Sequence, residues 1–238
     1  MKFVTYTNND GETPRFGFKR DDEIVDVIRS GIWVNENIKD SSFLTVPTTL
    51  KLALGNWDIN FSKLKNLNQA IPDTDLSSLE VDEKPIAIKE SEASLLPPVT
   101  NPDTFRDFYA FEQHVKAARK LRGLEMHPDW YKLPIFYFSN PTTLYGHGEI
   151  VPYPTGTEEL DFELEFAIII ANGGQNIKKE NADKMIAGYT ILNDWSARDL
   201  QREEMQLNLG PAKGKDFANS FGPYMVTPDE LTDAWDNN

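Results

Sequence analysis

The clearest pattern of hydrophobic and polar positions in the chain runs from position 159 to position 171. Acidic and apolar residues alternate there, and the two sets are Asp161, Glu163 and Glu165, and Phe162, Leu164 and Phe166. A period of two residues predicts a β-strand with one acidic face and one apolar face. Residues 167–170 are all apolar, so we expect this end of the strand to be buried on both faces.

The acidic face of this strand is a candidate for metal chemistry. Same-face neighbours on a strand lie about 7 Å apart, and partly buried carboxylates at that spacing repel each other and lose solvation. A divalent cation removes both costs, and oxygen-only ligands suit Mg²⁺, Ca²⁺ or Mn²⁺. The same pattern also fits an acidic strand face in solvent, and this segment alone leaves both interpretations open.

Shorter patterns predict a small, β-rich N-terminal domain over residues 1–84. Strands are expected at 3–6, 15–19 and 24–28, and turns at 8–11 and 21–22, as in a β-meander. Helical patterns are expected over 43–70, with Gly55 as a stop and a second helix at 58–70. Residues 71–84 are acidic and bounded by prolines, so we interpret them as a linker.

A second, catalytic domain is expected over residues 85–238. The helices expected in it are at 103–122, 181–186 and 196–205, and the strands at 86–88, 135–139, 159–171, 189–192 and 224–226. Long proline- and glycine-containing loops separate them, notably over 140–157. Many strands with short helices between them predict an α+β fold that is mainly β.

Composition narrows the class of protein. The longest apolar run, residues 166–171, is too short to span a bilayer, and the first residues lack the apolar core of a signal peptide. The chain of 238 residues has no cysteine, so disulfide and thiolate chemistry are excluded and a cytoplasmic location is expected. A net charge of −14 argues against nucleic acid and anionic membranes as partners. A small anionic substrate stays compatible with it.

Three further segments carry candidate chemistry. In RDFYAFEQH, residues 106–114, Asp107 and His114 are seven residues apart, so they share a face if one helix includes both. The alternative is an exposed acid and a histidine without a functional role. In ILNDWSARDLQ, a strand is expected to end at Asp194, which a turn or cap role would also explain, and Ser196 is expected to cap the next helix. Arg198 and Gln201 then share one face of that helix.

The third segment, GPAKGKDF, places two lysines on a loop. Glycine and proline disfavour regular structure around Lys213 and Lys215. Two lysines in a strongly acidic chain could bind a substrate anion or balance the local charge, and the segment alone does not decide between these roles.

Taken together, these stretches resemble the fumarylacetoacetate hydrolase family. The motifs LDFELE, NDWSARDLQ and GKDF follow the family's order and approximate spacing, closely from about Lys84 to Leu231 and more weakly before that. The resemblance implies a mixed, rolled β-structure around a divalent metal, Mg²⁺, Mn²⁺ or Ca²⁺. The ligands that it implies are Asp107, Glu163, Glu165 and Asp194. Asp161 matches a family position that does not bind the metal but lies next to the ligands and helps to orient them.

The resemblance also implies roles for the remaining residues. His114 matches the water-activating histidine, and the positions that contact substrate or developing charge are Tyr109, Tyr137, Arg198, Gln201 and Lys215. Family substrates carry a 1,3-dicarbonyl or 2-oxo acid group, as in fumarylacetoacetate and other acylpyruvates from aromatic catabolism. The metal stabilises the enolate formed when a C–C bond breaks, while hydroxide attacks the remote carbonyl. The presence of His114 favours hydrolysis.

Two departures from the family pattern bear on this reading. Asn219 stands where the family usually has threonine near the metal and substrate. The sequence ends at Asn238, where family members continue with strands that close the core, so we expect an incomplete core with an unpaired sheet edge. The alternatives that remain are a 2-oxo acid decarboxylase or isomerase on the same metal site, and a non-catalytic metal-bound binding protein. The family's habit of dimerising predicts a homodimer.

Overall fold

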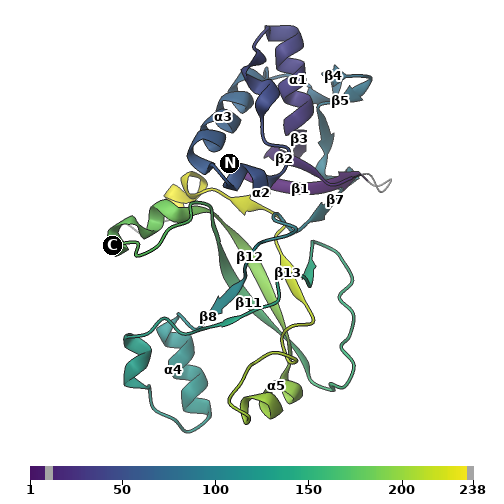
Figure 1. The fold of residues 1–238 in the computed structure, drawn as a ribbon. Helices are drawn as coiled ribbons and strands as arrows, with labels where there is room; N and C mark the ends of the chain where they lie inside the picture. Colours follow the sequence, from purple (N-terminus) through teal and green to yellow (C-terminus); the bar gives the residue numbers. More distant parts are fainter. Residues whose placement is uncertain (9–12, 235–238) are drawn as a thin grey trace.

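A computed structural model of the chain describes residues 1–8 and 13–234, and one large sheet dominates it (Figure 1). The strands of this sheet are β1 (Lys2–Asn8), β2 (Arg15–Arg20), β3 (Glu23–Asp26), β6 (Ala87–Lys89), β7 (Ala93–Leu96), β10 (Leu144–Tyr145), β11 (Leu160–Ile170), β12 (Ile186–Ala197), β13 (Asn219–Phe221) and β14 (Met225–Val226). Their order is β10-β13-β12-β14-β1-β2-β3-β6, with β11 paired to β12 and β7 paired to β1. Parallel and antiparallel pairs occur together, so the sheet is mixed.

Smaller elements surround this sheet. Two separate strand pairs are β4 (Glu80–Val81) with β5 (Lys84–Pro85), and β8 (Arg106–Phe108) with β9 (Phe136–Phe138). The α-helices of the described residues are α1 (Val27–Ile38), α2 (Leu50–Leu54), α3 (Trp57–Ala70), α4 (Glu112–Leu121) and α5 (Arg198–Met205). Short 3₁₀ turns lie at Ser41–Thr45, Leu76–Ser78, Glu90–Glu92, Pro128–Tyr131, Lys179–Met185 and Pro228–Ala234. The fold is the strand-rich α+β class that the sequence predicted.

The first three helices cover the N-terminal strands, and the main hydrophobic core lies between them. Phe3, Phe16, Phe18, Leu64 and Leu67 are completely or almost completely buried there. The strands predicted at 3–6 and 15–19, the turn at 21–22, the stop at Gly55 and the helix at 58–70 are confirmed. The predicted turn at 8–11 lies outside the described residues from position 9 onward.

Helix α1 is a feature that the strand prediction for 24–28 missed. Strand β3 ends at Asp26, whose carboxylate accepts a hydrogen bond of 2.8 Å from the backbone N–H of Arg29. This side chain is the N-cap of α1, so the chain turns into a helix at Val27 although the residues before it are β-formers.

Strand pairing joins the N-terminal and C-terminal parts of the chain. Strand β1 pairs with β2, with β14 and with β7, and β6 pairs with β3. The predicted linker at 71–84 also packs on the N-terminal core, because Ile71, Leu76 and Val81 are buried and β4 and β5 form a small hairpin. That part of the linker interpretation was wrong. The domain division at residue 84 stays a prediction.

Three predictions for the second half were also wrong. The helix expected at 103–122 is strand β8 followed by α4, so Asp107 and His114 lie on separate elements. Strand β12 continues through Asp194 and Ser196 because it pairs there with β11, and α5 has no side-chain cap at its first residue. Residues 179–185 form a 3₁₀ turn where an α-helix was expected at 181–186.

The apolar end of β11 is not buried on both faces as the sequence predicted. Ile168 and Ile170 are 50% and 56% exposed, and the same face continues with Phe162, Leu164 and Phe166, also exposed. Strand β11 pairs on one side only, with β12, and it therefore forms a sheet edge within the described residues. No helix in the described part of the chain combines the length and the apolar character needed to cross a membrane.

Candidate metal centre

Two antiparallel pairings bring four carboxylates together. The β11–β12 register sets Glu163 directly opposite Asp194, and Glu165 lies two residues further along the same face of β11. The short β8–β9 pairing sets Asp107 opposite Tyr137. Asp107, Glu163, Glu165 and Asp194 each offer one oxygen, and these oxygens all lie within 4.8 Å of one another.

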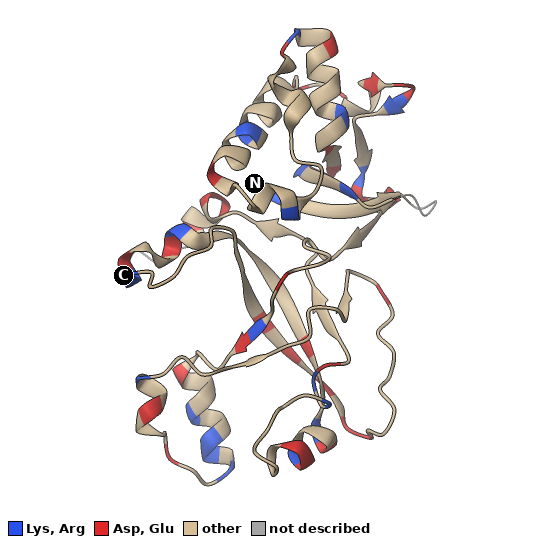
Figure 2. Ribbon diagram, viewed as in Figure 1, with Lys and Arg blue, Asp and Glu red and all other residues tan. Residues whose placement is uncertain are grey.

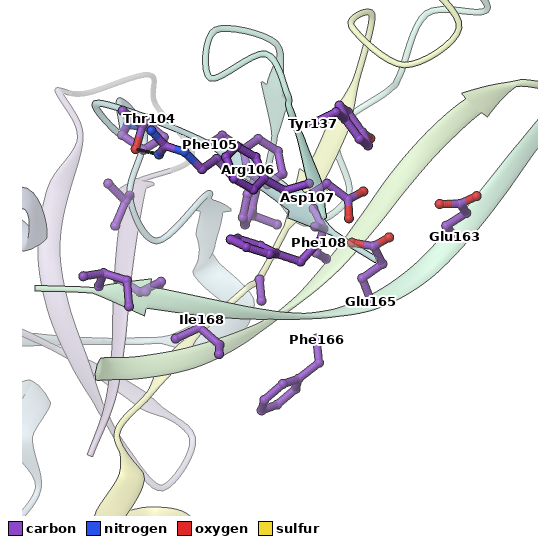
Figure 3. Close-up of a pocket in the computed structure, with 18 of the residues that line it drawn as sticks. Thr104, Phe105, Arg106, Asp107, Phe108, Tyr137, Glu163, Glu165, Phe166 and Ile168 are labelled. Atoms are coloured by element: carbon purple, nitrogen blue, oxygen red, sulfur yellow. Dashed lines mark hydrogen bonds between the residues drawn. The ribbon is translucent and has the colours of Figure 1, made fainter. Parts of the chain in front are cut away.

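The close-up in Figure 3 shows how strand geometry creates this cluster. The side chains of Glu163 and Glu165 project from β11 toward Asp107, while Phe166 and Ile168 project from the opposite face of the strand. The alternation read from the sequence therefore sorts the acids onto the cluster side. Figure 2 shows acidic positions in the middle of the two long strands, with a basic position on β8.

Electrostatics in the cluster disfavour full ionisation. Burial, followed by repulsion from Asp107, Asp194 and Glu163, raises the pKa of Glu165 to about 8. Burial and then repulsion from Asp194 raise the pKa of Asp107 to about 6. Burial also raises the pKa of Asp194. The centre therefore holds more negative charge than its own basic residues neutralise, which is the condition that a divalent cation relieves.

Two basic side chains compensate part of this charge. Lys215 is 2% exposed, and its Nζ lies 2.6 Å from Asp194 Oδ2 and 2.9 Å from Glu163 Oε2. Arg198 reaches Asp161 at 2.8 Å and Glu163 at 2.6 Å. Burial opposes ionisation of Glu163, but Lys215 and Arg198 together lower the pKa of this carboxyl below its usual value. Asp161 thus contacts Arg198, consistent with a supporting position.

The residues present fit a divalent cation. Asp194 is 1% exposed, and its Oδ1 has no hydrogen-bond partner among the described residues, although an unpaired buried carboxylate oxygen is costly. The remaining donors are carboxylate oxygens, the ligand type of Mg²⁺, Mn²⁺ and Ca²⁺. The structure brings the four predicted ligands together, and their role as ligands stays a prediction.

The other predicted site residues line a cleft whose wall also includes Asp107, Glu163 and Glu165. Tyr137 donates a 2.6 Å hydrogen bond to Asp194 Oδ2, and burial raises the pKa of this phenol. Gln201 accepts a 3.1 Å hydrogen bond from Arg198 on α5. Tyr109 and His114 line the cleft with their rings edge to face, 6.1 Å apart, and His114 is exposed on α4.

The sequence did not predict the contact between Ser196 and Lys215, and it did not predict where Asn219 lies. Ser196 was interpreted as a helix cap, but its Oγ accepts a 2.7 Å hydrogen bond from Lys215. The period of two from Asp194 to Ser196 is the signal that could have placed both on one face. Asn219 lies directly opposite Asp194 on β13, is fully buried, and donates through Nδ2 to Ser139.

A carboxylate cluster of this kind, beside a buried lysine, is typical of enzymes that use a divalent cation. Residues 103–238 match the family model described as fumarylacetoacetate (FAA) hydrolase C-terminal. This match covers more than half of the chain, so the chain belongs to the fumarylacetoacetate hydrolase family.

Individual relatives differ in the reaction named for them. The chain is 29% identical to a fumarylacetoacetase of Arabidopsis thaliana, across 97% of this chain and 60% of that protein. A 94-residue stretch is 40% identical to the oxaloacetate tautomerase YisK of Bacillus subtilis (strain 168), covering 39% of this chain and 31% of the relative. The chain thus spans about three fifths of the Arabidopsis relative's length.

A solved structure supports the fold. Maleylpyruvate hydrolase from Sphingobium sp. SYK-6, in complex with manganese (II) ion and pyruvate, superposes with a TM-score of 0.59. The superposition covers 98% of this chain and 69% of that one at 17% identity. At this identity the likeness establishes the fold alone.

Proposed function

We propose that this protein is a divalent-metal-dependent hydrolase that cleaves a C–C bond in a 1,3-dicarbonyl or acylpyruvate substrate such as fumarylacetoacetate. The observation that carries the proposal is the convergence of four carboxylates beside Lys215 and Arg198, which line a cleft together with Gln201. The 29% identity to a fumarylacetoacetase agrees with this choice of substrate class.

The proposed roles follow from the positions of the side chains. Asp107, Glu163, Glu165 and Asp194 would hold Mg²⁺, Mn²⁺ or Ca²⁺. When bound, such a cation supplies Lewis acidity to two adjacent substrate oxygens. Tyr137 holds Asp194 in place by its hydrogen bond. The phenol thereby limits the rotation of one ligand.

The basic groups would bind the substrate's own negative charges. Lys215 and Arg198 both pair with Glu163, and if Glu163 held a divalent cation, the N–H donors that now point at it would be available for substrate oxygens. Gln201 lies on the same helix face as Arg198 and accepts a hydrogen bond from it through Oε1, so its amide Nε2 would add a neutral donor. Tyr109 would line the substrate channel beside His114.

His114 would act as the general base. It lies on α4 in the wall of the cleft, exposed and therefore accessible to water. An imidazole can accept a proton from water near neutral pH, which is the step that hydrolysis requires before the remote carbonyl is attacked.

A second candidate is an isomerase or decarboxylase acting on a 2-oxo acid at the same centre. The stretch shared with an oxaloacetate tautomerase at 40% identity favours it. Neither reaction needs a water-activating base, so His114 would be dispensable for both.

One experiment separates these functions. The protein, loaded with Mn²⁺ or Mg²⁺, is assayed by ultraviolet absorbance and product analysis against a panel of acylpyruvates and 2-oxo acids, including oxaloacetate. Two acids formed with loss of the dicarbonyl absorbance support the hydrolase. Carbon dioxide or a tautomer alone would replace the proposal with the second candidate. Tight substrate binding without any product would indicate a binding protein.

A further inference from the structure

The loop that delivers Lys215 to the carboxylate cluster is held by one acidic side chain outside the cluster. We call residues 210–214 the lysine loop. Glu204, in the last turn of α5, accepts hydrogen bonds from the backbone N–H groups of Lys213 at 2.7 Å, Gly214 at 2.8 Å and Ala212 at 3.3 Å. Three consecutive amides thus converge on one carboxylate.

The same loop also lies directly on α5. The backbone oxygen of Gly214 accepts a 2.8 Å hydrogen bond from Ala197, at the start of α5. A Cβ added to Gly214 would lie 2.8 Å from the backbone nitrogen of Gln201, so only glycine allows this approach. Because α5 carries Arg198 and Gln201 and the loop leads into Lys215, the helix and the loop together present three of the five proposed substrate-binding residues.

The interaction between Glu204 and the loop is of a strong kind. Successive backbone N–H groups in a turn form a concave anion site, and here the anion is supplied by the protein itself. Hydrogen bonds to an ionised acceptor are about twice as strong as neutral ones. Burial opposes ionisation of Glu204, but the amides of Gly214, Lys213 and Ala212 lower the pKa of this carboxyl below its usual value.

The position of Lys215 depends on this loop because the lysine follows it immediately. Its Nζ contacts Asp194, Ser196 and Glu163 at 2.6 to 2.9 Å, so a displacement of about 1 Å would break these contacts. Misplacement of a site residue by about 1 Å can cost on the order of 10²-fold in rate.

We propose that Glu204 is a positioning residue that locks the lysine loop onto α5 and thereby fixes Lys215 at the carboxylate cluster. Glu204 acts through Lys215. The effect on turnover rests on the proposed function, whereas the attachment of the lysine loop to α5 does not.

The test uses Glu204→Gln and Glu204→Ala, with Glu203→Gln as a matched control that removes a charge from an exposed position one residue earlier on α5. Hydrogen–deuterium exchange is followed in overlapping peptides that contain residues 212–214. We expect exchange there to accelerate on the order of tenfold or more in Glu204→Ala, less in Glu204→Gln, which keeps one acceptor oxygen, and not in the control.

Binding measurements then separate positioning from general damage. Calorimetry with Mn²⁺ should give an affinity no weaker than that of the wild type, because all four carboxylates are retained. Pyruvate binding to the Mn²⁺-loaded variants, and kcat/KM on any turned-over substrate, should fall by about tenfold or more because Lys215 is no longer held.

Each result bears on the lock directly. Unchanged exchange at 212–214, or accelerated exchange with unchanged pyruvate affinity, would overturn the proposal. Loss of Mn²⁺ affinity in Glu204→Gln would instead show that the variant disturbs the whole centre, and would also overturn it. If the wild type turns over no member of the panel, the proposed function fails, while exchange and pyruvate affinity still judge the role of Glu204.

Discussion

Replacing Glu165 by glutamine should stabilise the metal-free protein at alkaline pH. The pKa of Glu165 is raised to about 8, first by burial and then by the neighbouring carboxylates. An ionised Glu165 therefore costs the folded state free energy that the unfolded chain does not incur. Glutamine has nearly the same shape and cannot ionise, so the variant removes this cost.

The sign and magnitude follow from linkage. The folded pKa of about 8 lies above the unfolded value of 4.5, so the folded state binds more protons between these limits and the wild type loses stability as pH rises through them. Each pKa unit corresponds to about 1.4 kcal/mol. Because Glu165 stays partly exposed to solvent, we discount the full shift to an expected gain on the order of 2–4 kcal/mol above pH 8. No gain is expected below about pH 4.5.

The assay is urea denaturation of both proteins in the presence of a chelator at pH 4.5, 7 and 9. Glu163→Gln is the matched control, because it lies on the same face of the same strand but has a lowered pKa. Replacing Glu163 should destabilise the protein near neutral pH, since Lys215 and Arg198 each lose one of their ion-pair partners. Adding Mn²⁺ should stabilise the wild type more than Glu165→Gln, which has lost a proposed ligand.

A Glu165→Gln variant that is no more stable than the wild type at pH 9 without metal would refute this reasoning. So would a gain of equal size at pH 4.5 and pH 9, because the stabilisation would then have no connection with ionisation.

Further predictions concern the ligands, the base, the packing and the assembly. Asp194→Asn should weaken Mn²⁺ binding in calorimetry by about 10²-fold or more, and undiminished affinity would exclude Asp194 as a ligand. His114→Ala should keep Mn²⁺ affinity and lose on the order of 10²–10⁴-fold in hydrolysis, whereas full activity would favour the isomerase or decarboxylase. Gly146→Ala should lower the melting temperature, because its Cβ would lie 2.5 Å from the backbone oxygen of Leu95; an unchanged transition would contradict this. We propose a homodimer that covers the exposed apolar face of β11, so sedimentation velocity should report a dimer that Leu164→Lys weakens, and a monomeric wild type would count against it.

Much of the candidate metal centre could be predicted from local sequence. The alternation from Asp161 to Phe166 sorts acids and apolar residues onto opposite faces of any strand, whatever its neighbours are. The motifs around Asp107, Asp194 and Lys215 have residue types that suit a hard cation and an anionic substrate. The structure brings Asp107, Glu163, Glu165 and Asp194 together and places Lys215 in contact with two of them.

Other features depend on which segments meet in space. The strand pairing of β8 with β9, and of β12 with β11, overrides local helix and turn preferences at Asp107 and Ser196. The exposure of Ile168 reflects the absence of a covering layer among the described residues, which hydropathy cannot show.

The hold of Glu204 on the lysine loop is the clearest case of a tertiary feature. The partners of Glu204 are backbone N–H groups, which almost every residue type carries, so no pattern of side chains in the sequence predicts them. Sequence alone thus determined which chemical groups this protein has and which face of its long strand carries the acids. Only the tertiary structure decided how those groups are held, because pairing, covering and loop anchoring are contacts between distant segments.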